Sequence, residues 1–486
     1  MEFLAKYHHR LKYLYAVIFG LIGGVVVSKM EVVGFAALIA IPIIIGFFYY
    51  YFQNPKLGLY GAFFITFWTP FVGRYVPVNI PFGLGVDIFL VLTLLIILIR
   101  DWKKADFSGW NHIMSLLMMA WMGLIILEIA NPLALSLPAW FYAMRGLGLY
   151  QCLMVLICFV IFRDRQDFVN FVKFWVFFSL IGALWGIKQK FFGLGPVEMK
   201  WLMKGAYKTH LLFGKLRIFS YYPDAGMFGP AMGQLLIFFG ILFLGPFSIK
   251  KRIAFGIIAF LGLYAMLISG TRGALAVPGA GGILYLIMIR NRRLLISGFT
   301  VMALAFSFLK YTSIGSGNYD IQRLRTALDP NDASLNVRLK NREMLKVYLS
   351  GKPFGTGIGS AGFWGQRFTP WTWMANFPTD GLYTRVRAET GVIGYTLYVY
   401  TWLFLLVYGV WQTWQYKDRK KQYFAIASLA SFAGILAASY GNEILNQIPV
   451  NFATLIPLTF VFTMKYWDPV DGKYRIPEER KHKIFK

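Results

Sequence analysis

The chain has 486 residues, of which 57% are hydrophobic and only 15% are charged, and its formal net charge is +27. A water-soluble domain of this size needs more polar surface to cover its core, so the composition excludes a soluble globular protein. It predicts an all-α polytopic bundle of transmembrane helices, because barrel strands are shorter and alternate in polarity.

Apolar runs long enough to cross a bilayer as helix recur along the whole chain. We expect about 12 to 14 spans, within a single integral membrane domain that covers residues 1–486. No small-residue cleavage site follows the first run and basic residues precede it, which indicates an uncleaved anchor and a cytoplasmic N-terminus. The expected spans begin near Tyr13, Val32, Leu57, Phe82, Trp110, Ala139, Phe168, Met227, Ile253, Ala274, Leu294, Ala388, Tyr423 and Ile448.

Basic clusters support this path, because cytoplasmic loops of membrane proteins carry the excess of Lys and Arg. All of them fall on one side of a path of about 14 spans, together with a basic cytoplasmic tail at 466–486. Much of the net charge is therefore a topology signal and an attraction to membrane lipids, and we expect no nucleic-acid partner. The clusters are RDWKK from Arg100, RDR from Arg163, KKR from Lys250, RNRR from Arg290 and KDRKK from Lys417.

Cysteine and histidine usage argues against a metal centre. Cys152 and Cys158 are the two cysteines, and both lie inside one apolar run, with no His or Cys cluster at metal-ligand spacing. We therefore expect no disulfide, no metal and no cofactor.

Two long segments fall on the side opposite the basic clusters, at 192–226 and at 311–387, the latter between late spans. The second contains an amphipathic stretch, Val337 to Leu349, that is suited to lie on a bilayer surface. Its glycine-rich run GKPFGTGIGSAGFWG is either a flexible loop or an anion nest, and lacks the Walker pattern. The tryptophans at 364, 371 and 373 form either an interfacial aromatic belt or a platform on which sugars stack.

Charged residues within apolar runs invite a functional or a structural interpretation, since they are costly at membrane depth. Asp87, Glu128 and Arg145 are such residues, and the structural alternative is that Arg145 pairs with Glu128 or Asp87. Arg272 is held in SGTRGA, a short turn between two runs, and Arg217 begins RIFSYYPDAGMFG. Arginine matches phosphate oxygens with a planar fork of donors, so these two residues are candidates to clamp a lipid diphosphate.

Further cations lie in the same two outer segments. Lys215 stands two residues before Arg217, and the other four are Arg338, Arg342, Arg385 and Arg387. Not all of them fit around one diphosphate at once.

The order of these motifs resembles the O-antigen ligase and O-antigen polymerase superfamily, integral membrane glycosyltransferases that use polyprenyl-diphosphate-linked glycans. The resemblance rests on RIFSYYPDAGMFG before a span, SGTRGA between two spans, an arginine-bearing helix in a long loop, KPFGTGIGSAGF, and the closing DGLYTRVRAETGVIGY. It implies that Arg217 and Arg272 bind the donor diphosphate, with Arg338 or Arg342 nearby.

The closing motif departs from the ligase pattern at one position. Ligases of this family typically carry a histidine nine positions before the motif's glutamate, as the base that takes a proton from the acceptor hydroxyl. Here the glutamate is Glu389, and nine positions earlier stands Asp380. Asp380 is therefore our candidate base, with His210 in the other outer segment as its competitor.

These observations lead to an expected function and two alternatives. The expected function is a bacterial surface-polysaccharide polymerase for O-antigen or exopolysaccharide in the cytoplasmic (inner) membrane, with both termini cytoplasmic. At the outer face it would transfer a glycan from polyprenyl diphosphate to a lipid-linked repeat unit, with a chain-length regulator as a candidate partner. The alternatives are an O-antigen ligase, whose acceptor is lipid A core or protein, and a membrane transporter.

Overall fold

The computed structural model describes residues 38–76, 83–315, 319–326 and 333–467, except 163 and 213, together with Ser28 and Gly317. Almost all of these residues are helical. The strands of the described part form one short antiparallel hairpin, β1 (Leu211–Leu212) and β2 (Lys215–Leu216). The expected span near Tyr13, the start of the span near Val32, and the tail beyond Trp467 lie outside the described residues.

Nine helices in the described part are long and apolar enough to cross a membrane. This set, with almost no strand, indicates an all-α multi-pass membrane protein. The nine are α4 with η2 (Ile113–Ala130), α5 to α6 through η3 (Leu137–Ile161), α7 (Arg165–Phe192), α10 (Ala225–Phe243), α11 (Ile249–Ile268), η5 with α12 (Arg272–Ile289), α13 (Arg292–Tyr311), α18 (Leu382–Trp414) and α19 (Arg419–Ala438).

Three further helices begin near expected span starts without belonging to that set. They are α2 (Lys56–Tyr75), α3 (Leu84–Arg100) and α20 (Val450–Thr463). Apart from Ala388, each expected start within the described residues therefore coincides with a helix start to within a few residues. Fewer of the described helices than expected have the length and composition of a span.

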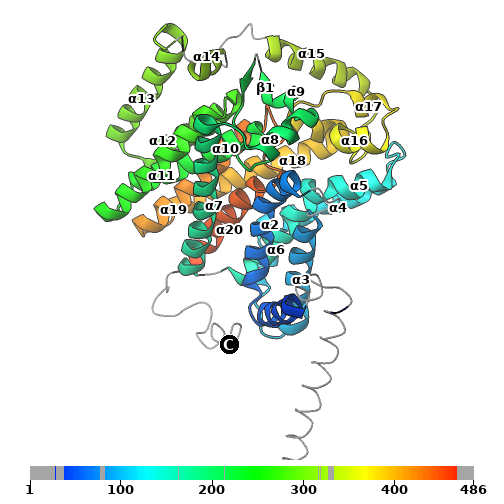
Figure 1. Cartoon of the computed structure of the whole chain (residues 1–486). Coiled ribbons are helices and arrows are strands. Elements are labelled where there is room, and N and C mark those ends of the chain that lie inside the picture. The colour runs from blue at the N-terminus through cyan, green and yellow to red at the C-terminus, as the bar shows by residue number, and fades with distance from the viewer. Residues whose placement is uncertain are drawn as a thin grey trace, which may run out of the picture.

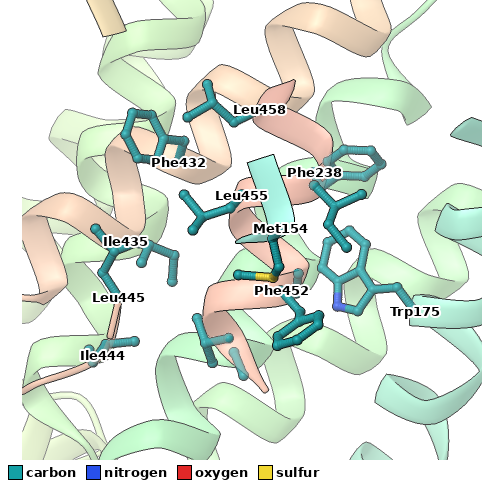
Figure 2. Close-up of a cluster of buried hydrophobic side chains, with 14 of the residues drawn as sticks. Met154, Trp175, Phe238, Phe432, Ile435, Ile444, Leu445, Phe452, Leu455 and Leu458 are labelled. Carbon is teal, nitrogen blue, oxygen red and sulfur yellow. The ribbon is translucent and has the colours of Figure 1, made fainter. Parts of the chain in front are cut away.

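Helix α20 forms the centre of the bundle. All 14 of its residues are buried, which suits a helix that is apolar on every side. Its neighbours include α6, α7, α10 and α19, whose side chains surround it (Figure 2). The labelled core residues on these helices are Met154, Trp175, Phe238, Phe432 and Ile435, and those of α20 are Phe452, Leu455 and Leu458.

The polar segments gather at one end of the bundle, which we call the loop end (the top of Figure 1). Between α7 and α10 the chain forms α8 (Pro196–Trp201), η4 (Leu202–Ala206), α9 (Tyr207–His210) and the hairpin. Between α13 and α18 it forms α14 (Tyr319–Arg325), α15 (Ala333–Tyr348), α16 (Gly362–Phe368) and α17 (Trp373–Asn376). The helix expected at Val337 to Leu349 is therefore present as α15.

Inside the bundle, Arg145 pairs with Asp87. Two guanidinium nitrogens lie 3.1 and 2.7 Å from the two carboxylate oxygens, and Tyr150 accepts a further hydrogen bond at 2.9 Å. The structural interpretation of Arg145 is thus confirmed with Asp87 as its partner. Glu128 instead accepts a hydrogen bond from the Asn131 side chain at 2.8 Å.

Helix α18 begins six residues before the expected start at Ala388, because it contains a break. At Gly391 the backbone has φ 63° and ψ −158°, a combination that is essentially restricted to glycine. The break separates a polar first segment from the apolar span. Gly355 of the preceding loop packs against it, since a Cβ on Gly391 would lie 2.4 Å from the Gly355 nitrogen and 2.1 Å from the Pro353 oxygen.

We expect Gly391→Ala to destabilise the protein by about 1–3 kcal/mol from backbone strain alone, with further loss from the contact with Pro353. Thermal unfolding of the purified protein in detergent measures this as a lower midpoint. Gly123→Ala on α4 is the matched control, because nothing lies within 4 Å of a Cβ added there. Equal midpoints for the two variants would contradict the assignment of strain to Gly391.

Candidate functional site

A polar cavity of about 310 Å³ opens at the loop end, where three chain segments meet. The start of α10 contributes Asp224, the residues before α18 contribute Asp380, and the connection from α19 to α20 contributes Asn442, Glu443 and Gln447. Carboxylates and amides thus dominate the lining, and the cavity suits a ligand rich in hydroxyl groups.

Asp380 is fixed at this cavity by the backbone that follows it. Gly381 has φ 99° and packs so closely that a Cβ there would lie 2.2 Å from the Tyr440 oxygen. The Leu382 amide donates to the Ser439 oxygen at 3.0 Å. The Asp380 side chain remains 51% exposed, so it is placed firmly and is still accessible to a substrate.

Helix α15 brings two predicted arginines to the same place. The Arg338 Nε lies 3.9 Å from an Asp380 carboxylate oxygen. The Arg342 guanidinium lies over the Tyr440 ring, 3.9 Å from its centroid, and donates to the Tyr440 hydroxyl. Both side chains belong to the inward face of α15, on which Leu345 is buried.

A second group of arginines surrounds the turn that carries Arg272. Arg217 donates to the Thr271 hydroxyl at 2.9 Å and to the Thr209 carbonyl at 3.2 Å. Arg323 of α14 donates to the Gly270 carbonyl. Arginines from three different segments therefore converge on one short turn.

This turn is packed against the polar cavity. The Thr271 hydroxyl donates to the Ala225 carbonyl at 2.6 Å, in the first residue of α10, and Asp224 caps that helix by accepting from the Met227 amide at 2.9 Å. A Cβ on Gly273 would lie 3.9 Å from the Asn442 side-chain nitrogen. The structure thus brings the arginine turn to the same helix start that lines the cavity with Asp380.

Arg385 lies beside the site but is held by the protein itself. Its side chain is only 16% exposed, it contacts Glu389 at 3.1 Å, and it donates to Glu443. Two carboxylates thus neutralise its charge. Arg387 lies over the Tyr395 ring at 5.9 Å, and Lys215 is exposed on strand β2. Arg385 and Arg387 are therefore engaged by groups of the protein itself, while Lys215 is exposed.

The glycine-rich run before α16 packs against the polar first segment of α18. The Thr356 and Gly357 amides donate to the Ala388 and Glu389 carbonyls at 3.0 and 2.9 Å. The Ala361 amide lies 3.4 Å from a carboxylate oxygen of Glu389. The run therefore packs against the start of α18, while its interpretation as a flexible loop or as an anion nest stays a prediction.

His210 is placed as a structural residue. Its ring packs between Trp201 and Phe219, with centroids 5.3 and 5.0 Å away, and its Nδ1 bonds with the Ala206 carbonyl at 2.9 Å. Burial lowers the pKa of His210 below its usual 6.5, which favours the neutral ring. His210 is not among the described lining residues of the polar cavity, whereas Asp380 is, so Asp380 remains the candidate base.

The sequence interpretation missed the polar residues between α19 and α20, and also Arg323. Asn442, Glu443, Asn446 and Gln447 form a polar run between two buried helices, and that run was the available signal. Glu443 in particular contacts a residue 58 positions away, so its role depends on the tertiary fold.

No protein-family model matches this chain, and no curated protein matches its sequence.

Proposed function

We propose that the protein is a membrane glycosyltransferase of the surface-polysaccharide polymerase type. Its donor is a polyprenyl-diphosphate-linked glycan, and its acceptor is a lipid-linked repeat unit. The observation that carries the proposal is the cavity at which Asp380 stands beside Arg338 while the Arg217 and Arg272 turn packs against the same helix start.

The chemistry requires a base and cations, and these residue types supply both. The acceptor hydroxyl attacks the anomeric carbon of the donor, its proton passes to the Asp380 carboxylate, and the bond from that carbon to the diphosphate oxygen breaks. Arg217 and Arg272 stabilise the negative charge of the departing diphosphate through fixed, bidentate donors. A single displacement of this kind inverts the anomeric configuration.

The distribution of basic loops supports a reaction on the outer face of a bacterial cytoplasmic membrane. Because they gather on one side of the predicted path, the loop end faces away from the cytoplasm. A lipid-linked donor at headgroup level can reach the loop end there. The aspartate at the position where ligases typically carry histidine favours a repeat-unit acceptor, and hence a polymerase.

We expect Arg272→Ala to lower transfer by about 10²–10³-fold, the usual cost of removing one fixed donor to a developing charge. Arg272→Lys keeps the charge but loses the fork, so we expect it to restore only part of the activity. The measurement is the length profile of surface glycans and lipid-linked intermediates in a deletion strain that is complemented with each variant at equal protein level.

The same experiment separates the alternative functions. Single repeat units in the deletion strain support a polymerase, whereas long chains retained on the lipid carrier show a ligase. If surface glycans are unaffected and liposomes that contain the purified protein show solute flux, the proposed function is wrong and the protein is a transporter.

A further inference from the structure

A second cavity, of about 360 Å³, adjoins the polar cavity. Glu443 and Gln447 line both of them. The second cavity is also lined by Tyr142 of α5, by Trp364 of α16 and by Asn446. The proposed reaction steps do not use this second cavity.

One wall of the second cavity is aromatic and flat. The Trp364 and Tyr142 rings are stacked with centroids 4.7 Å apart and planes 16° apart, and the Phe368 ring lies nearly parallel to both. Stacking fixes the orientation of the Trp364 ring before any ligand arrives. A preorganised ring of this kind suits the apolar C–H face of a pyranose, because its π face is electron-rich.

The other wall offers hydrogen-bonding groups of the kinds that hydroxyls need. The Glu443 carboxylate accepts, while the Gln447 amide both donates and accepts. Asn446 is fixed in place, since its side-chain oxygen accepts from Gln151 and from Tyr398, each at 2.7 Å. A flat apolar wall opposite a few placed polar groups is the usual form of a site for a small polar ligand.

The chain is also distorted where it lines this cavity. The long helix from Leu137 to Ile161 contains a π-helical turn, Arg145–Leu149, and Gly146 and Leu147 of that turn belong to the lining. Single π-helical turns are frequent at functional sites. A Cβ on Gly146 would lie 2.7 Å from the Asn446 carbonyl oxygen, so the turn brings α5 close to the polar wall.

We propose that the second cavity is a glycan-binding subsite in which a pyranose ring stacks on Trp364. Its occupant is the acceptor glycan, an assignment that rests on the proposed function. The donor diphosphate needs free positive charge, and the one cation among the described lining residues, Arg385, is neutralised by Glu389 and Glu443. Because Glu443 and Gln447 line both cavities, a sugar held here presents its hydroxyls toward the cavity of Asp380.

The test is direct binding without turnover. The probe is the oligosaccharide of one repeat unit, released by mild acid from the host strain's own surface polysaccharide, titrated into the full-length protein in nanodiscs. We expect Trp364→Ala to raise Kd roughly tenfold, or about 1.4 kcal/mol. Trp364→Phe should retain most of the affinity, which separates loss of stacking from loss of folding.

Trp371→Ala is the matched control, since this neighbouring tryptophan is 75% exposed and is not part of the cavity lining. Its Kd should equal that of the wild type. The inference is overturned if the wild type does not bind the probe up to its solubility limit, or if Trp364→Ala and Trp371→Ala bind alike.

Turnover then distinguishes this inference from the proposed function. With both lipid-linked substrates, Trp364→Ala should raise the KM for the acceptor and leave the KM for the donor unchanged. If surface glycans do not depend on the protein, the proposed function fails, while binding lost only in Trp364→Ala still establishes a glycan site. If transfer is confirmed but the acceptor KM does not move, the acceptor assignment alone is wrong.

Discussion

Replacing Asp380 by asparagine is expected to lower the rate of glycan transfer by about 10²–10⁴-fold, the usual contribution of a positioned general base. Asparagine keeps the size of the side chain and one acceptor oxygen but takes up no proton. The protein should therefore fold normally and retain its lipid-linked donor. The measurement is the initial rate of glycan transfer at saturating donor. The Kd for the repeat-unit oligosaccharide is an independent check that the variant is folded.

Asp418→Asn is the matched control for this prediction. Asp418 caps α19 by accepting from the Lys420 amide at 2.9 Å, it is not part of the described lining of either cavity, and asparagine caps a helix about as well as aspartate. We expect near-normal transfer from this variant. Near-normal transfer by Asp380→Asn would exclude Asp380 as the base, and Glu443, which lines the same cavity, would be the next carboxylate to test.

The sequence predicted the helical architecture well because membrane helices have a strong local signal. Length and apolar composition placed helix starts close to those observed, even for α20, whose 14 residues are shorter than a usual span. The predicted start of α18 was wrong by six residues, because a hydropathy pattern does not detect a polar helical segment that is joined to the span through Gly391.

The candidate site was predictable only in part. The positions of Asp380, Arg217 and Arg272 followed from motif order, whereas their convergence depends on the packing of α10 against the 269–272 turn. Arg385 was interpreted as a substrate cation although Glu389, four residues later, was visible as a helical partner. The polar run that contains Glu443 was visible in the sequence, whereas the contact of Glu443 with Arg385 arises only when α18 and the connection after α19 meet.

The buried ion network of Arg385 yields a prediction that does not depend on the enzyme proposal. Glu389 is fully buried, and Arg385 bridges it to Glu443. Removing one partner from a buried pair leaves an uncompensated charge, which typically costs 3–5 kcal/mol. We therefore expect Arg385→Met to lower the free energy of unfolding by about 3–5 kcal/mol.

Thermal unfolding in detergent measures this loss, and Arg387→Met provides the control. Arg387 lies two residues further along α18, over the Tyr395 ring, so its loss should cost only about 0.5–1 kcal/mol.

Adding Glu389→Gln to Arg385→Met should recover part of the stability, because the amide carries no charge that needs a partner. If both methionine variants unfold alike, or if the double variant is no better than Arg385→Met, the network does not hold the start of α18 against the connection between α19 and α20. A confirmed network would mean instead that Glu443 reaches both cavities in one fixed orientation, since the bond from Arg385 restricts its rotamer, and the geometry of the site would depend on Arg385 through the position of Glu443.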